Sequence, residues 1–194
     1  MTRLPPVSDR DAGLGAKVAF YFMKRNFTRL TGRQDDAMIE PVRVMAHIPK
    51  LLSGYGKLEQ AAAKVHLLDR RHRALAELKA ATVVRCEYCI DLGSRISRDW
   101  GLTDDDLLAL PNYRSAARFT DVDKLVLEYA AAMSRTPVEV TDELFGKLRS
   151  QFNTAQLVEL TFIIALENLR GRFNLAMGIG SAGFSEGMVC AIPD

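Results

Sequence analysis

The stretch RCEYCIDLGSR, residues 85–95, places Cys86 and Cys89 three positions apart in a chain that has only one other cysteine. Residues three apart on a helix lie on one face, so the two side chains can meet without unwinding the backbone. If the pair occupies the first turn of a helix, free backbone N–H groups and the positive end of the helix dipole stabilise a thiolate. The thiolate is the form that attacks peroxides and disulfides, so this spacing permits a reactive dithiol.

The charges beside the cysteines act in opposite directions. Arg85 favours a thiolate, whereas Glu87 and Asp91 oppose it if they point at the sulfur atoms. Two buried cysteines that serve only as small apolar side chains would have the same spacing. The motif by itself leaves the functional and the purely structural interpretation open.

Metal binding is another common use of closely spaced cysteines, and the sequence does not favour it. A structural zinc site needs four ligands. Cys190, His47, His66 and His72 offer no second pair at ligand spacing. We therefore expect neither a metal nor a cofactor, histidines that lie on helix surfaces or in the core, and Cys190 as a bystander in a loose tail.

The composition predicts one globular domain in the cytoplasm. The 194 residues are 48% hydrophobic and 26% charged, which suffices for one well-buried core. Basic residues are scattered among a similar number of acidic ones, so we expect no nucleic-acid partner. The first residues lack the apolar core of a signal peptide, and KVAFYFMKR is too short to span a membrane. In a reducing cytoplasm a close cysteine pair is more often catalytic or metal-binding than a structural disulfide.

Apolar residues recur at helical spacing through nearly the whole chain, and the alternation typical of strands is hardly found. The sequence therefore predicts an all-α fold of packed helical hairpins. Capping residues, prolines and glycines bound the expected helices. These helices cover residues 16–30, 36–46, 49–64, 69–84, 86–100 and 154–177, with three more that begin at Thr103, Thr120 and Thr141. The glycine-rich segment GIGSAGFSEG that follows cannot be helical.

We expect residues 1–35 to form an N-terminal helical arm and residues 36–194 to form the main helical domain. Apolar residues recur along the arm at about one helical turn: Val18, Tyr21, Phe22 and Phe27. Because exposed aromatic side chains are costly, we expect this face to be packed. The number of apolar stripes in the chain also predicts a stable homo-oligomer.

The region around the cysteines resembles the core of the carboxymuconolactone decarboxylase superfamily, and more narrowly its alkylhydroperoxidase D-like branch. The run that carries the resemblance is LAELKAATVVRCEYCIDLGSRISRDWGLTDDDLLAL. The likeness continues through HIPKLLSGYGKLEQA, RTPVEVTDELFGKLRSQF and ALENLRGRFNLAMGIGSAGFSEG, and covers about residues 40 to 190. The resemblance implies an all-α fold, assembly into trimers or hexamers, and thiol-dependent reduction of peroxides. It also implies that Cys89 attacks the peroxide and that Cys86 resolves the product.

The motif of the peroxidase branch is incomplete in this chain. That branch carries a glutamate twelve residues before the first cysteine and a histidine four residues after the second, which relay a proton to the thiols. The corresponding positions here are Ala74 and Gly93, and a position between the cysteines that is sometimes histidine is Tyr88. Positioned acid–base groups contribute about 10²- to 10⁴-fold to a rate, so we expect slow turnover.

Two other carboxylates are candidates for supplying the proton. Glu77 lies three residues after the missing glutamate, about one helical turn away. Glu167 lies on an otherwise apolar helix, in one stripe with Arg170 and Asn174. A solvated surface acid and a buried Glu–Arg pair explain the two glutamates equally well. Together with the two cysteines they form the set of candidate catalytic residues.

These observations favour an enzyme, a thiol-dependent oxidoreductase of the antioxidant peroxidase type. Its substrate would be a hydroperoxide, another small molecule or an oxidised thiol partner, and a thiol reductant or partner protein would restore the dithiol. One alternative is a decarboxylase or isomerase that acts on a small cyclic acid and needs no thiol. The other is a non-enzymatic redox-sensing module that kept the cysteines after losing the relay.

Overall fold

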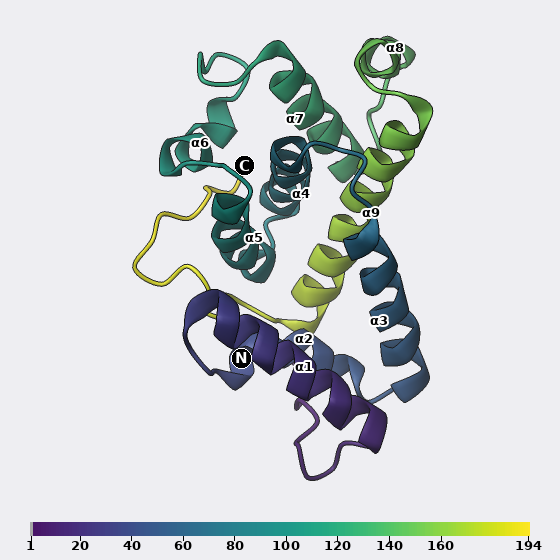
Figure 1. Ribbon diagram of the computed structural model, residues 1–194, viewed down its shortest axis with the longest axis vertical. Helices are drawn as coiled ribbons and strands as arrows, with labels where there is room; N and C mark the ends of the chain where they lie inside the picture. Colours follow the sequence, from purple (N-terminus) through teal and green to yellow (C-terminus); the bar gives the residue numbers. More distant parts are fainter. Residues whose placement is uncertain (1) are drawn as a thin grey trace.

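The computed structural model describes residues 2–194, and within that range the chain forms nine α-helices and no strand (Figure 1). The helices are α1 (Leu14–Thr31), α2 (Glu40–Met45), α3 (Pro49–Lys64), α4 (Arg70–Val84), α5 (Glu87–Asp99), α6 (Asp104–Ala109), α7 (Asp121–Ser134), α8 (Asp142–Gln151) and α9 (Thr154–Met177). Two short 3₁₀ segments, η1 (Asp36–Ile39) and η2 (Leu110–Asn112), precede α2 and follow α6. The all-α prediction is confirmed.

The helix boundaries follow the local sequence closely. Thr103 and Thr120 each form a capping box with the aspartate three residues later, which satisfies free N–H groups at the starts of α6 and α7. Asp69 caps α4 through the backbone N–H of Arg71. Gly32 ends α1 with φ at 73°, a left-handed conformation that glycine adopts without steric cost.

Helix α4 lies at the centre of the bundle, with α5, α7 and α9 packed around it (Figure 1). Its sequence RRHRALAELKAATVV is rich in alanine, which lets neighbouring helices approach closely on several sides. Even Lys79, in the middle of the helix, is buried, and its ammonium contacts the Asp194 carboxylate at 2.6 and 2.8 Å. Helix α4, which leads into the cysteines, is thus fixed by three neighbouring helices and by the C-terminal residue Asp194.

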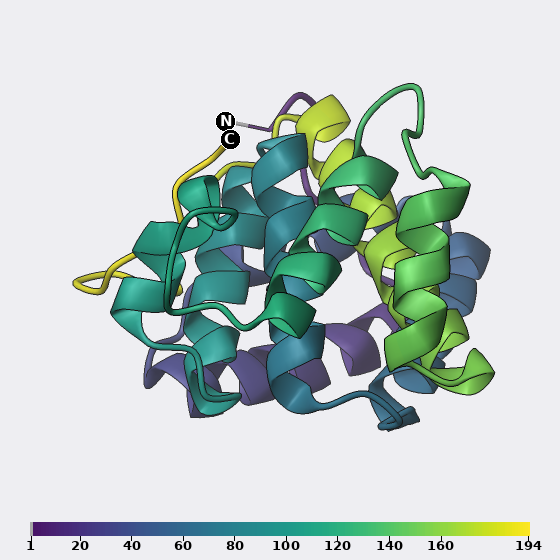
Figure 2. The ribbon, with the colours of Figure 1, turned by 90° about the horizontal axis from the view of Figure 1, so that it is seen from above.

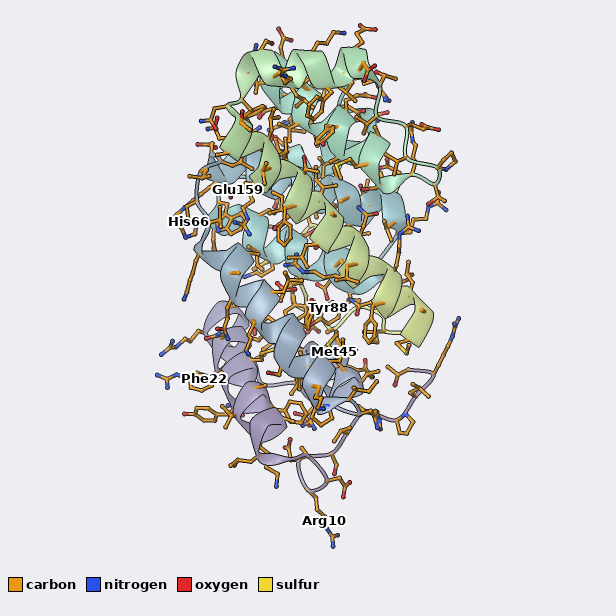
Figure 3. All side chains as sticks on the ribbon, turned by 90° about the vertical axis from the view of Figure 1, so that its right-hand side faces the viewer. Arg10, Phe22, Met45, His66, Tyr88 and Glu159 are labelled. Carbon is orange, nitrogen blue, oxygen red and sulfur yellow. A yellow bond between two sulfur atoms is a disulfide. The ribbon has the colours of Figure 1, made fainter. Side chains whose placement is uncertain are left out.

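The arm packs on α2 and α3 with a different face from the one expected. Ala16 and Phe20 are buried in a second hydrophobic cluster. Within one chain the predicted packing holds for Phe27, whose ring lies 4.9 Å from that of Phe184, and is wrong for Val18, Tyr21 and Phe22, which are 48%, 59% and 55% exposed. Figure 3 shows Phe22 at the outer side of α1, pointing away from the rest of the molecule. The helical repeat was correct, but within one chain only one side of α1 faces another helix.

The tail after α9 is anchored rather than loose. It runs along the outer side of α5 and returns toward α4 (Figures 1 and 2). The backbone N–H of Ala191 donates to Ser94 on α5, and Arg98 donates to the carbonyl of Val189. Cys190 lies in this anchored segment, where its thiol is exposed and unpaired. In residues 2–194, no helix is long and apolar enough to cross a membrane.

Candidate functional site

Both cysteines lie at the first turn of α5. Helix α4 ends at Val84, and Arg85 adopts a left-handed conformation with φ at 61°, which turns the chain directly into α5. Cys86 is the N-cap residue of α5, and its sulfur accepts a hydrogen bond from the backbone N–H of Cys89 at 3.2 Å. A free N–H group of the helix start therefore faces the sulfur of Cys86, where it would stabilise a thiolate.

The structure joins Cys86 and Cys89 in a disulfide, with their Cα atoms 5.2 Å apart. Cys86 is fully buried, whereas Cys89 is 7% exposed. Of the two buried residues, Cys89 is therefore the one that retains some exposed surface.

The two acidic neighbours of the cysteines have other partners or face away. Asp91 directs its carboxylate to the tail, where it accepts hydrogen bonds from Ser181 Oγ and from the backbone N–H groups of Ala182, Phe184 and Ser185 at 2.7–3.0 Å. Glu87 is exposed and lies against the tail at Gly180. The carboxylate of Asp91 thus anchors the tail, and its opposition to a thiolate is weaker than its place in the sequence indicated.

Tyr88 serves packing and does not reach a sulfur atom. Its hydroxyl donates a hydrogen bond to the carbonyl of Met38, and its ring meets Phe184 edge-on at 5.4 Å. Burial raises the pKa of Tyr88 far above its ordinary value, so the hydroxyl stays protonated. The ring links α5 to η1 and to the tail.

Asn174, on α9, contributes the side-chain amide that lies beside the disulfide. Its Nδ2 lies 3.7 Å from the sulfur of Cys86 and 3.6 Å from that of Cys89, and the residue is 3% exposed. Gly171 lies one turn earlier on α9, where an added Cβ would come within 3.4 Å of the Cβ of Cys86. Its absence of a side chain lets α9 approach the cysteines. The sequence placed Asn174 on a buried stripe, but no feature of the sequence assigned it to the sulfur atoms.

The candidate acids Glu77 and Glu167 meet at one guanidinium group. Arg170 Nη1 lies 2.8 Å from Glu167 and 4.0 Å from Glu77. Its other nitrogens donate to both oxygens of Glu59 on α3 at 2.8 and 2.6 Å, a contact that the sequence did not reveal. The three glutamates therefore surround Arg170, with Glu167 buried and Glu59 and Glu77 half-buried, which confirms the Glu–Arg pair. Glu167 lies seven residues before Asn174, about 10 Å along the helix axis.

Burial and the charge of Arg170 shift the pKa values of these three glutamates in opposite directions. Burial raises the pKa of Glu77, although Arg170 and Arg73 oppose the rise. It likewise raises the pKa of Glu167 against the attraction of Arg170. For Glu59, burial acts in the same direction, but the hydrogen bonds and charge of Arg170 outweigh it and lower the pKa. Pairing with Arg170 thus lowers the pKa of Glu59, whereas burial shifts the pKa values of Glu77 and Glu167 upward.

The two positions of the missing relay are packed against apolar neighbours. Ala74 is buried in the main core. A Cβ added at Gly93 would lie 3.1 Å from Cδ1 of Leu78, so a histidine ring there would displace that leucine. The glycine at this position therefore serves close packing of α4 and α5.

The three histidines lie outside the cysteine site, either beside other polar groups or at the surface. His47 Nε2 lies 2.9 Å from the carbonyl oxygen of Pro5, His72 lies 3.5 Å from a carboxylate oxygen of Asp123, and His66 is exposed. Among residues 2–194, no three His, Cys, Asp or Glu side chains are placed to hold a metal ion.

The chain is similar in sequence to proteins of one known family. The model of the carboxymuconolactone decarboxylase family matches residues 49–132. The YnjA protein of Escherichia coli strain K12 is 36% identical over 161 residues, which are 81% of this chain and 84% of that protein. The chain belongs to the carboxymuconolactone decarboxylase family.

Solved structures share the arrangement of helices. The debrominase Bmp8 superposes with a TM-score of 0.73 at 20% identity, over 95% of this chain and 94% of that one. A cysteine-to-alanine variant of Bmp8, in complex with 2,3,4-tribromopyrrole, gives the same TM-score. A peroxidase-related protein with an alkylhydroperoxidase AhpD core, from Ralstonia eutropha, has a TM-score of 0.71 at 18% identity, over 100% of this chain and 98% of that one. The chain thus has the fold of the AhpD core.

Proposed function

We propose that this protein is a thiol-dependent oxidoreductase, whose Cys86–Cys89 pair alternates between dithiol and disulfide while it reduces hydroperoxides or an oxidised thiol partner. The observation that carries the proposal is the bonded pair at the start of α5, where the backbone N–H of Cys89 donates to the sulfur of Cys86. A purely structural role for the cysteines would need no such placement. The expected cytoplasmic location agrees with this use, because reducing compartments keep thiols available.

The cycle assigns different roles to the two sulfur atoms. Cys89 is the more accessible, so its thiolate attacks the terminal peroxide oxygen, and the O–O bond breaks to give a sulfenic acid and an alkoxide that takes a proton. The thiolate of Cys86 then attacks the sulfur of Cys89, and hydroxide leaves as water after protonation. Two thiols of an external reductant restore the dithiol and become a disulfide themselves.

The protons that the leaving oxygens need are assigned to Glu77 or Glu167. Burial favours the protonated form of both carboxyl groups. One buried oxygen of Glu167 has no hydrogen-bond partner among residues 2–194, which makes a full negative charge on this carboxyl group more costly. Since Glu167 lies about 10 Å from Asn174 along α9, a proton would have to pass through intervening groups or water. We therefore expect a slow peroxidase.

Steady-state peroxide consumption with a dithiol reductant tests the proposal. We expect Cys86→Ser and Cys89→Ser to abolish turnover and Cys190→Ser, which changes the exposed free thiol, to leave it unchanged. Glu77→Gln and Glu167→Gln should each lower the rate, by up to the roughly 10²-fold at the lower end of acid–base contributions. Rapid turnover that neither glutamine variant reduces would show that the proton comes from another source.

A redox-sensing role is the second candidate, because the sulfur atoms are nearly buried and the family relay is absent. A sensor would be oxidised once by peroxide and would not turn over when the dithiol reductant is present. The decarboxylase or isomerase alternative predicts instead that neither cysteine is needed for activity. Turnover of the wild-type protein therefore separates the peroxidase from the sensor, and the cysteine variants separate it from the decarboxylase or isomerase.

We also propose that the protein forms a homo-oligomer, a trimer or hexamer by resemblance. An exposed stripe on α9 supports this, with Val158 64%, Phe162 41% and Leu169 51% exposed. Together with exposed Ala165 these residues are spaced four, three and four apart, which is the repeat of helices that pack against helices of another chain. The exposed aromatic residues of α1 form a second apolar surface for such contacts.

A further inference from the structure

Asn174 is the side-chain group of α9 that reaches both reacting sulfur atoms. Its Nδ2 lies 3.7 and 3.6 Å from them, within the range of a hydrogen bond from nitrogen to sulfur. The residue is buried, and it follows the cysteines by 85 or more positions in the chain. A buried amide at a disulfide is costly unless it makes hydrogen bonds, and the sulfur atoms are its hydrogen-bond partners in this structure.

The surrounding residues hold this amide in place. Gly171, one turn before Asn174, lets α9 approach the turn between α4 and α5 at van der Waals distance. Arg170, beside it, is fixed by both oxygens of Glu59 and by Glu167. The segment of α9 that carries Asn174 is therefore bound to α3 through Arg170, and it packs against Cys86 at Gly171.

The amide acts differently on the two redox states. A disulfide sulfur is a weak acceptor, whereas a thiolate is an anion that a nearby N–H donor stabilises strongly. Cys86 already accepts from the backbone N–H of Cys89, so a thiolate at Cys86 would have two donors. Opening of the disulfide is therefore favoured in the direction that releases Cys86 as the thiolate.

We propose that Asn174 is a catalytic residue of the dithiol cycle, one that stabilises the thiolate released from the disulfide and so raises the reduction potential of the pair. This inference rests on the dithiol cycle proposed above. In the reductive step, the thiolate of an external reductant attacks the sulfur of Cys89, and the electrons of the S–S bond pass to Cys86. A second reductant thiolate then attacks the mixed disulfide, which releases Cys89 and forms the reductant disulfide; solvent supplies the protons.

The test is a redox titration with glutathione of the Cys190→Ser protein and its Asn174→Leu variant. Leucine has the branched shape of asparagine, with two methyl groups in place of the amide oxygen and nitrogen, so it is larger but removes the side-chain N–H donor. Loss of the donor should lower the equilibrium constant for reduction about tenfold, which is about 30 mV in a two-electron couple. The pH at which thiolate absorbance appears in the reduced protein should rise as well.

Asn168→Leu is the matched control. Asn168 lies on the same helix, but its amide donates to Ser134 and to the carbonyl of Ile164 at 2.9 Å, away from the cysteines. Its replacement should leave the potential and the thiolate titration unchanged. If Asn174→Leu does not fold, Asn174→Ser replaces it, because serine is smaller and adds no apolar surface. This variant should also lower the reduction potential.

An unchanged potential and an unchanged thiolate titration in folded Asn174 variants would overturn the inference. The equilibrium titration does not depend on peroxide turnover. A protein that consumes no peroxide but shows the Asn174-dependent shift would refute the proposed peroxidase and support the role of Asn174.

Discussion

The two sulfur atoms differ in their surroundings, and in the proposed cycle this difference would set the order of the chemistry. Cys86 is fully buried and accepts from the backbone N–H of Cys89, whereas Cys89 retains some exposure. In thiol–disulfide exchange the accessible sulfur is attacked and the sulfur with the better stabilised thiolate leaves. Both criteria point to attack at Cys89 and departure of Cys86.

Ionisation of Glu167 should make the stability of the protein depend on pH. Burial raises its folded-state pKa above the unfolded value of about 4.3. Between these two values the native state binds more protons than the unfolded state, so stability falls as pH rises through that window. Glu167→Gln cannot ionise, so the variant should gain stability relative to wild type from pH 5 to pH 8, by about 1.4 kcal/mol for each pKa unit between the two states.

Urea unfolding at several pH values measures this difference. Glu143→Gln is the control, because Glu143 is exposed on α8 and pairing with Lys147 lowers its pKa. Its titration lies below the tested range, so that variant should follow wild type. A difference between Glu167→Gln and wild type that stays constant with pH would contradict the raised pKa.

The sequence revealed the part of the site that is local in the chain. The spacing of Cys86 and Cys89 and the helix start beside them follow from neighbouring residues. Asn174 and Glu59 could not be assigned in the same way, because their contacts depend on how α9 and α3 pack against distant helices. Tyr88 shows the same limit, since its partner Met38 lies 50 residues away.

The approach of α9 to the cysteines depends on Gly171. A Cβ at this position would lie 3.0 Å from Cγ1 of Val84 and 3.4 Å from the Cβ of Cys86. Although alanine is the better helix former, we expect Gly171→Ala to destabilise the protein by about 1–3 kcal/mol through overpacking. Denaturant unfolding measures the change.

Gly146→Ala provides the comparison within another helix. An added Cβ at Gly146, on α8, meets no atom within 4 Å. Helix propensity should then stabilise this variant by about 0.5–1 kcal/mol. Equal effects of the two substitutions would show that α9 does not depend on close contact at Gly171.

The tail is attached to α5 mainly through Asp91. Its carboxylate accepts one hydroxyl and three backbone hydrogen bonds from residues 181–185. Asn at this position replaces one acceptor oxygen by a donor that faces other donors, so Asp91→Asn should cost about 2–3 kcal/mol. We expect faster proteolysis of the tail and a lower urea midpoint.

Asp99→Asn tests whether the effect is specific to the tail. Asp99 lies on the same helix, is exposed and pairs with Arg95 at 3.1 Å. An exposed pair of this kind contributes about 0.5 kcal/mol or less. If both variants lose the same stability, the tail is held by its apolar contacts instead of by Asp91.

Most helices could be predicted because their ends are marked by residues that act locally. Thr103, Thr120 and Asp69 cap helices within three residues of their own position. The exposed face of α1 was not predictable in this way, since its aromatic pattern fits burial against any neighbour. Which face packs is decided by α2 and α3, and the remaining face stays free within one chain.

The bundle as a whole is organised around α4, and its outer surface leaves an apolar stripe on α9 unpaired. If this stripe joins subunits, Leu169→Glu should shift the protein toward monomers by placing a charge in the contact. Sedimentation at micromolar concentration measures the state of assembly. Phe22→Glu, on the exposed face of α1, tests the other surface. Wild-type protein that sediments as a monomer would contradict assembly through either the α9 stripe or the exposed face of α1.

The central claim is that Cys86 and Cys89 act together as a reversible dithiol. Reduced Cys190→Ser protein treated with one equivalent of hydroperoxide tests it most directly, by mass and by thiol titration. We predict that the protein loses two hydrogens and both thiols together, that one peroxide is reduced for each pair, and that a dithiol reductant restores the original mass. Oxidation of a single cysteine by addition of oxygen, or a mass that does not change, would contradict the claim.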